Sequence, residues 1–260
     1  MITLEAIKNF YPDYLTRKAG FHKYLLKEYV LLLILDYLSA TTFVRKVVFI
    51  GGTSLRLVKN IDRFSEDLDF DCKLFSKAEF TEMTNGVIKY IRDNGLRVEV
   101  KDKEDSSLKA FRRNIYFPEL LYEMGLTRHR EERFLIKIEC QDQLVKYNPD
   151  IVNIKGCGFF FPMPVPPATV LCSMKIAAML GRQKGRDFYD VMFLLSQTPP
   201  DFNFLSKKCG ISNMEDLKMA IKNMLKKVNL KNKARDFEHL LFHKSNSQRI
   251  LRAAEFFKSL

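Results

Sequence analysis

Three aspartates, Asp67, Asp69 and Asp71, alternate with apolar residues in one short segment of the chain. The apolar residues predict a strand from Leu68 to Cys72, and side chains alternate along a strand, so all three carboxylates would share one face. Neighbouring carboxylates on that face would lie roughly 7 Å apart at the Cα level, close enough to share divalent cations. Unpaired, they would repel one another, and burying them would be costly. The segment therefore predicts a strand whose acidic face either meets water or binds a cation such as Mg²⁺.

A glycine turn precedes this strand. The β-branched run 46–50 predicts a buried strand, which Gly51 and Gly52 end in a turn, and Thr53 or Ser54 is expected to cap a following helix. Glycines allow a ligand to approach the backbone closely, and a helix N-terminus offers N–H groups to an anion. A phosphate-binding turn beside a carboxylate cluster is the arrangement that nucleotide transfer requires. The sequence contains neither a P-loop motif nor a G-x-G-x-x-G motif, so those two nucleotide sites are not supported.

Composition limits the class of protein. Hydrophobic residues make up 47% of the 260 residues, which is enough for a core and excludes an intrinsically disordered chain. The formal net charge is +12, and residues 201–260 alone hold 13 Lys or Arg against 6 Asp or Glu. This excess favours a polyanionic partner or a phosphate-bearing substrate.

The cellular compartment is predicted from three weaker features. The five cysteines include no C-x-x-C pair, which argues against a zinc ribbon or a disulfide framework. The first residues lack the pattern of a signal peptide. The most apolar run, Tyr29 to Leu35, is far shorter than the roughly 20 residues of a membrane span. We therefore expect a cytoplasmic protein with no membrane association.

The pattern of elements changes along the chain. Helices are expected at 21–39 and 76–94, and further strands at 96–100, 112–117 and 134–140 around a polar connection at 101–109. After a proline-rich connector at 161–167, only helices are expected, at 168–180, 186–196, 214–228, 235–242 and 248–260. The fold class predicted is α+β, with a mixed-sheet domain at residues 1–160 and an all-helical domain at 168–260.

Three motifs together resemble a known family. GGTSLRL (51–57), RFSEDLDFD (63–71) and MKIAAMLGRQKGRDFYDVMFLL (174–195) are similar to the AbiEii/MenT nucleotidyltransferases, toxins of bacterial type IV toxin–antitoxin and abortive-infection systems. The resemblance covers about residues 45–195. It implies a polymerase-β-like nucleotidyltransferase fold that transfers a nucleoside monophosphate from an NTP bound to Mg²⁺, or to Mn²⁺. In the MenT branch the acceptor is the 3′ end of tRNA, and a cognate antitoxin is an expected partner.

The resemblance also implies roles for individual residues. Asp67 and Asp69 would be the catalytic, metal-binding pair, and Lys175 and Asp187 would complete the catalytic set. The nucleotide-binding residues that it implies, together with Arg63 of the same motif, are Gly51, Gly52, Thr53, Ser54, Ser65, Lys175 and Arg186.

Alternatives remain open for the charged residues. If its strand neighbours Leu68–Cys72, Glu139 is expected to be the third metal ligand; the alternative is that it simply pairs with Lys137 or another surface cation. Lys175 is either a cation over the triphosphate or an ordinary solvated lysine. Asp187 and Asp190 either hold Lys175 or Arg186 in place or reflect the preference of a helix N-terminus for acids.

Three hypotheses follow for function. The first is a Mg²⁺-dependent nucleotidyltransferase that acts on RNA, with tRNA as the expected acceptor, as the toxin of a two-component system. The second keeps this chemistry with a small-molecule acceptor, for which an acidic rather than a basic surface is expected. The third is a catalytically idle RNA-binding module, against which the intact carboxylates argue.

Overall fold

The computed structural model describes residues 2–100 and 110–260, so the polar connection expected at 101–109 lies outside the described residues. The chain forms two compact units. The first consists of Met1–Asn60, Phe64–Leu144 and Pro149–Val165, and the second of Ile61–Arg63, Val145–Asn148 and Pro166–Leu260.

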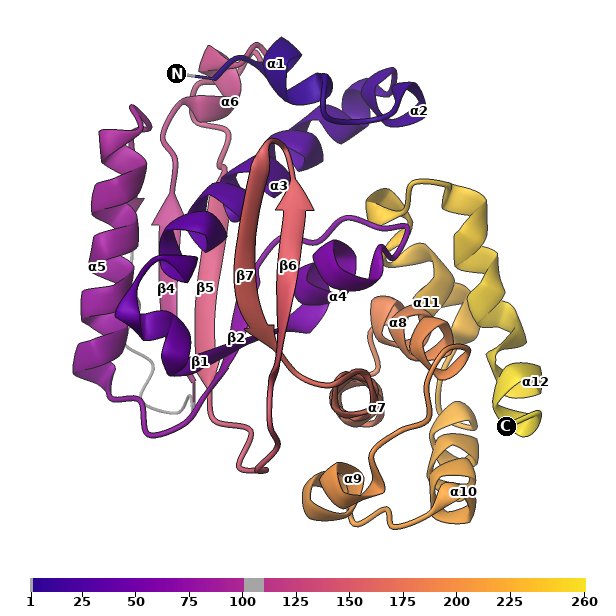
Figure 1. Cartoon of the computed structure of the whole chain (residues 1–260). Helices are drawn as coiled ribbons and strands as arrows, with labels where there is room; N and C mark the ends of the chain where they lie inside the picture. Colours follow the sequence, from indigo (N-terminus) through magenta and orange to yellow (C-terminus); the bar gives the residue numbers. More distant parts are fainter. Residues whose placement is uncertain (1, 101–109) are drawn as a thin grey trace. The chain divides into compact units, whose positions relative to one another are not determined.

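A five-stranded mixed sheet is the centre of the first unit (Figure 1), in the order β1-β2-β5-β4-β3. Its strands are β1 (Val47–Ile50), β2 (Leu68–Cys72), β3 (Glu99–Val100), β4 (Phe111–Tyr116) and β5 (Leu135–Gln141). Strands β2 and β5 are parallel, whereas β1 pairs antiparallel with β2, and β4 with both β5 and β3. The α+β class expected from the sequence is confirmed.

Alternation along the two central strands separates a core face from a polar face. On β2, Leu68, Phe70 and Cys72 are buried, and on β5 the buried residues are Ile136, Ile138 and Cys140. The residues between them include the charged side chains of both strands, which lie on the opposite face of the sheet. The burial of apolar side chains therefore decides which residues β2 and β5 present on the polar face.

Helices pack around this sheet. The long helix α3 (Ala19–Ser39), expected at 21–39, buries apolar residues on more than one face. Helix α5 (Lys77–Asp93) begins with a capping box between Ser76 and Glu79, and Phe80 stacks on Phe111 of β4 with ring centroids 5.6 Å apart. The remaining helices of the first unit are α1 (Leu4–Lys8), α2 (Asp13–Thr16), η1 (Thr42–Arg45), α4 (Gly51–Lys59) and α6 (Leu120–Glu123).

A β-hairpin replaces most of the expected proline-rich connector. Strands β6 (Asp150–Gly156) and β7 (Phe159–Val165) pair antiparallel, so the prediction of a connector from residue 161 is wrong. Pro162 and Pro164 are two residues apart and thus turn their ring nitrogens to the same side. Because each strand of a two-stranded sheet has one open edge, both nitrogens can face that edge without losing a ladder hydrogen bond.

The second unit is helical. Its elements are α7 (Ala168–Arg182), α8 (Gly185–Leu195), α9 (Phe202–Cys209), α10 (Met214–Leu225), α11 (Leu230–Arg235), η2 (Glu238–Leu240), η3 (Lys244–Arg252) and α12 (Ala253–Lys258). The expected helix at 235–242 is wrong, because α11 ends at Arg235 and only a short 3₁₀ turn follows. None of the helices in the described ranges is long and apolar enough to cross a membrane.

Candidate active site

The two central strands bring Asp69 and Glu139 together. In the parallel register of β2 and β5, Asp69 lies directly opposite Glu139, and side chains at paired positions project from the same face. Asp67 lies one residue before β2. The expectation that the strand of Glu139 neighbours Leu68–Cys72 is therefore confirmed, and three carboxylates belong to one polar face of the sheet.

Two cations lie among these carboxylates. The Nζ of Lys137 is 3.3 Å from Asp67 Oδ2 and 3.6 Å from Glu139 Oε2. From β4, Arg112 donates to Glu139 Oε2 through Nε at 2.9 Å and lies 2.8 Å away through Nη2. The four side chains are between 22% and 36% exposed. In the structure, Glu139 therefore pairs with Lys137 and also with a second cation, Arg112.

This pairing bears on the predicted metal site. Within residues 2–100 and 110–260, no group of three or more His, Cys, Asp or Glu side chains is gathered closely enough to hold a metal ion. Glu139 is engaged by two basic side chains, and its role as a third metal ligand stays a prediction. Mg²⁺ commonly binds one or two carboxylates together with substrate phosphates, and metal binding by Asp67 and Asp69 stays a prediction.

The third aspartate of the motif has a different environment. Asp71 is only 1% exposed, and its Oδ1 accepts a hydrogen bond from the backbone N–H of Gln143 at 2.8 Å. The acidic face expected from three alternating aspartates is therefore limited to Asp67 and Asp69. Asp71 instead connects β2 to the segment that follows β5.

The glycine turn lies against Asp69. Helix α4 begins at Gly51, which has φ +83°, and the residue at the N-cap position is Ile50 rather than Thr53 or Ser54. A Cβ atom at position 51 would overlap the Asp69 carboxylate. Glycine is therefore required here both by backbone conformation and by the closeness of the aspartate.

The hydroxyl groups of this turn point inward. Thr53 Oγ1 donates a hydrogen bond to the carbonyl oxygen of Asp67, which joins the turn to the start of β2. Ser54 is fully buried, and its Oγ has no hydrogen-bond partner among the described residues. Ser65 is also buried, whereas Gly52 is half-buried. The groups of the turn that suit an anion are therefore backbone N–H groups at the start of α4.

A buried ion pair holds α4 in place. Arg56 donates from Nε and Nη2 to the two carboxylate oxygens of Glu28 on α3, at 3.0 and 3.2 Å. The hydroxyl of Tyr11 donates to Glu28 Oε1 at 3.1 Å. A bidentate pair of this kind fixes geometry more strictly than a single contact does. The helix that carries the glycine turn is therefore anchored to the longest helix of the unit.

The remaining predicted residues belong to the second unit. Arg63 donates from Nε and Nη2 to the two oxygens of Asp190, both at 2.7 Å, and Lys175 donates to Asp190 Oδ2 at 2.8 Å. All three residues are at most 5% exposed. The nucleotide-binding role expected for Arg63 disagrees with this burial, because the guanidinium is enclosed with its carboxylate. The expectation that Asp190 holds Lys175 is confirmed.

Asp187 makes a separate set of contacts. It is fully buried, accepts two hydrogen bonds from Arg182 at 3.0 and 2.7 Å, and accepts one from the backbone N–H of Lys184 at 3.1 Å. It therefore caps the start of α8 and engages neither Lys175 nor Arg186 through these bonds. Arg186 itself is half-buried. The catalytic roles of Lys175 and Asp187 stay predictions.

Lys137 and Arg112 are the site residues that the sequence analysis did not select. Lys137 entered it only as one partner for Glu139, and Arg112 only as the start of a strand. The signal for both is the strand register, since Arg112 lies opposite Glu139 on β4. That pairing joins positions far apart in the sequence, so local patterns do not reveal it.

Comparison with known proteins agrees with this architecture. Residues 33–254 match the family model described as nucleotidyl transferase AbiEii toxin, type IV TA system. The fold is similar to that of MenT4, a nucleotidyltransferase toxin from Mycobacterium tuberculosis H37Rv, with a TM-score of 0.59 and 19% identity over 100% of this chain and 91% of that one.

A second solved structure is also similar. The protein JHP933 from Helicobacter pylori has a TM-score of 0.53 and 20% identity, over 91% of this chain and 90% of that one. No curated protein matches the chain. Since the family model covers most of the sequence, the chain belongs to the AbiEii nucleotidyltransferase toxin family of type IV toxin–antitoxin systems.

Proposed function

We propose that the protein transfers a nucleoside monophosphate from an NTP to an RNA acceptor, the 3′ end of tRNA, in a reaction that depends on Mg²⁺ or Mn²⁺. The observation that carries this proposal is the polar face of β2 and β5, where Asp69 lies opposite Glu139 and against the glycine turn. It combines hard oxygen ligands with a helix N-terminus that suits phosphate.

The residues present fit a divalent cation. Asp67 and Asp69 are half-exposed carboxylates on one face, and the missing Cβ of Gly51 leaves room for the Asp69 carboxylate at the turn. A cation held by these two aspartates would neutralise the triphosphate and polarise the α-phosphorus. Lys137 supplies positive charge at the same face without metal, since it lies within 3.3 Å of Asp67.

The protein's own groups have distinct roles in this reaction. Backbone N–H groups at the start of α4 bind the phosphates, and Thr53 keeps that turn against the aspartate segment through its bond to the Asp67 carbonyl. The acceptor hydroxyl oxygen attacks the α-phosphorus, the bond to pyrophosphate breaks, and pyrophosphate leaves. The hydroxyl proton passes to a carboxylate of the same face.

Charge supports RNA over a small cationic acceptor. The formal net charge is +12, and residues 201–260 hold 13 Lys or Arg against 6 Asp or Glu. A polyanion gains affinity from such a surface through the release of counterions. A small cationic acceptor would instead be repelled by it.

Label transfer tests the proposal. Purified protein is incubated with total cellular RNA, Mg²⁺ and each α-labelled NTP in turn, beside Asp69→Asn and the control Asp93→Asn, whose carboxylate on α5 is 64% exposed. We expect a labelled band of tRNA size with wild type and Asp93→Asn, and at least about a thousandfold loss with Asp69→Asn. Full transfer by a folded Asp69→Asn variant would overturn the assignment of the site. Label on a small molecule in place of RNA would favour the second hypothesis.

A further inference from the structure

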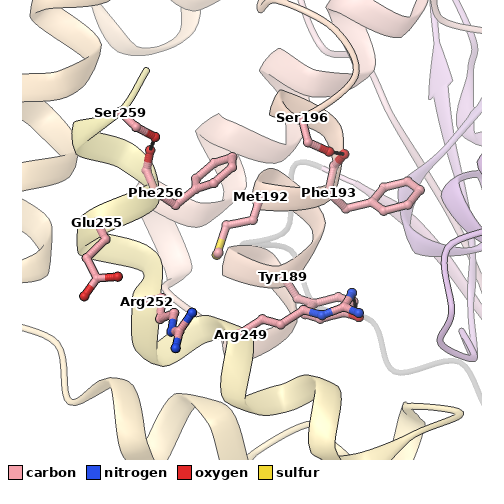
Figure 2. A pocket seen from close by; sticks show the side chains of 9 residues that line it. All are labelled: Tyr189, Met192, Phe193, Ser196, Arg249, Arg252, Glu255, Phe256 and Ser259. Carbon is pink, nitrogen blue, oxygen red and sulfur yellow. Dashed lines mark hydrogen bonds between the residues drawn. The ribbon is translucent and has the colours of Figure 1, made fainter.

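A cavity of about 590 Å³ lies within the second unit, between α8, η3 and α12. Figure 2 shows the side chains that line it. Small-ligand sites commonly have volumes of about 300–1,000 Å³, so the cavity is large enough for a group the size of a nucleotide. The cavity lining includes none of the residues that bind the phosphates or the cation in our proposed function.

Two of its walls are apolar. The ring of Phe256 on α12 and the thioether of Met192 on α8 point toward the same space in Figure 2, and both side chains are half-buried. The hydroxyls of Ser196 and Ser259 each donate to a backbone carbonyl of their own helical segment at 2.8 Å. These two walls therefore offer a flat or apolar group dispersion contacts and stacking.

The charged groups that line the cavity are the guanidinium groups of Arg249 and Arg252 and the carboxylate of Glu255. In Figure 2, Arg249 extends alongside Tyr189, whereas Arg252 points away from it. Arg249 Nη1 donates to the Tyr189 hydroxyl at 3.2 Å, and that hydroxyl donates to Asp62 Oδ1 at 2.7 Å. Burial and the hydrogen bond to Asp62 raise the pKa of Tyr189, which keeps the hydroxyl protonated as a donor. Arg249 is thereby oriented, while Arg252, three residues along η3, is exposed at the same cavity.

We propose that this cavity binds one unpaired nucleotide of the acceptor RNA, with its base between Met192 and Phe256 and a phosphate at Arg252. The proposal rests on the proposed function, because it takes RNA as the acceptor. A base stacks on an aromatic ring whatever its sequence, and a guanidinium matches the geometry of a phosphate.

Other classes of ligand leave part of the cavity unmatched. The lining holds two arginines and one carboxylate, that of Glu255, so its charge is positive and an apolar peptide or a lipid tail would leave that charge unmatched. Inorganic phosphate would leave the walls at Met192 and Phe256 uncovered, and an acidic peptide of aliphatic side chains has no flat ring to place there. A nucleotide of a polyanion matches both the apolar walls and the positive charge, and the basic charge of residues 201–260 favours that polyanion.

RNA binding measured without NTP tests the proposal. A fluorescently labelled single-stranded RNA is titrated with full-length wild type, Phe256→Ala and Arg252→Gln across a series of salt concentrations. Two controls match these changes in type: Leu251→Ala, an exposed apolar residue of η3, and Lys89→Gln, a basic residue of α5 that is 82% exposed and lies outside the basic segment 201–260. Circular dichroism and thermal unfolding verify that each variant is folded.

We expect Phe256→Ala to weaken single-stranded RNA binding by about tenfold, as the loss of one stacked base predicts. Arg252→Gln should weaken binding and lower the slope of log K against log salt by about one. The controls should stay within about twofold of wild type. A blunt RNA duplex should bind wild type and Phe256→Ala equally, because it offers no unpaired base.

Three results would overturn the assignment. They are unchanged single-stranded RNA binding by folded Phe256→Ala and Arg252→Gln, displacement of the RNA by free NTP, and tight binding of a polyglutamate peptide that these same substitutions abolish. Failure of the proposed function is distinguishable, since wild type would then bind RNA as described and transfer no label. Conversely, Phe256→Ala could transfer label normally with an unchanged KM for tRNA. The cavity would then have no role in binding the acceptor, and the proposed function would stand.

Discussion

Two clusters of opposite charges in this chain differ mainly in their burial. On the polar face of the sheet, Asp67, Glu139 and Lys137 are between 22% and 30% exposed, and Lys137 lies 3.3 to 3.6 Å from the two carboxylates. In the helical unit, the side chains of Asp190 and Arg63 are both 1% exposed and 2.7 Å apart.

Burial decides what each cluster can do. Half-exposed ion pairs contribute little to stability, so their partners can be exchanged at low cost. A buried pair cannot lose one partner without leaving an isolated charge in a medium of low polarity. We infer that the first cluster can exchange Lys137 for a metal ion, whereas the second holds its helices in a fixed arrangement.

Removal of the central carboxylate of the buried cluster should have the largest effect. Asp190→Ala leaves Arg63 and Lys175 buried without their shared anion, and we expect the free energy of unfolding to fall by about 3–5 kcal/mol. Chemical denaturation followed by circular dichroism measures this change. Asp93→Ala breaks an exposed pair with Lys89 and should cost less than about 0.5 kcal/mol.

A second variant covers the case in which Asp190→Ala does not fold. Asp190→Asn retains the shape of the side chain and removes only its charge, so a smaller loss of the same sign is expected. If both variants unfold within about 1 kcal/mol of wild type, the buried cluster does not have the structural role that we assign to it.

The second-largest effect is expected at low pH, which should reduce the stability that the buried cluster contributes. Burial alone would raise the pKa of Asp190, but Arg63 and Lys175 outweigh it and lower that pKa to about 2. A carboxyl with a lowered pKa in the folded state stabilises the protein above its unfolded pKa of about 3.9. This stability, about 2–3 kcal/mol at 1.4 kcal/mol per pH unit, should therefore be lost as the pH falls from about 4 toward 2.

The measurement is the free energy of unfolding against pH for wild type and Asp190→Asn. Glu79 also has a pKa lowered to about 2, chiefly by its hydrogen bond to Lys46, so wild type alone does not isolate Asp190. The difference between the two curves does isolate it. Parallel curves between pH 4 and 2 would contradict the lowered pKa.

A substitution at Gly51 should disturb the half-exposed site through the backbone of the glycine turn. Gly51→Ala places a methyl group against the Asp69 carboxylate at a residue with φ +83°, and we expect it to cost about 1–3 kcal/mol and to reduce nucleotide transfer. Gly20→Ala is the matched control, because it lies in α3 with no atom within 4 Å of the added Cβ. It should be neutral or slightly stabilising. Equal behaviour of the two variants would show that the turn tolerates a side chain.

The sequence is sufficient for elements whose pattern is local. The strand expected at 134–140 corresponds to β5, and the helix expected at 76–94 corresponds to α5. The β6–β7 hairpin was missed because Pro162 and Pro164 suggested a connector, and only an open strand edge makes these residues compatible with a ladder.

The sequence predicted only part of the candidate site, because local patterns reveal only contacts between residues that are close in the chain. Asp69 and its glycine turn are close in sequence, and the motif identified them together. The contact of Lys137 with Asp67, and of Arg112 with Glu139, depends on strand register between segments far apart in the chain. The burial of Arg63 is equally nonlocal, because its partner Asp190 lies on another segment of the helical unit.

The smallest expected effect concerns the exchange of Lys137 for a metal ion. Lys137→Met removes the ammonium group that lies within 3.6 Å of Asp67 and Glu139, so the carboxylates should bind Mn²⁺ several-fold more tightly, a gain of about 1 kcal/mol. Titration followed by electron paramagnetic resonance of free Mn²⁺ measures this affinity without any turnover. Lys89→Met on α5, 82% exposed, removes the same charge away from the face and should leave the affinity unchanged. Weaker Mn²⁺ binding by Lys137→Met alone would mean that the lysine organises the carboxylates for the metal and does not compete with it.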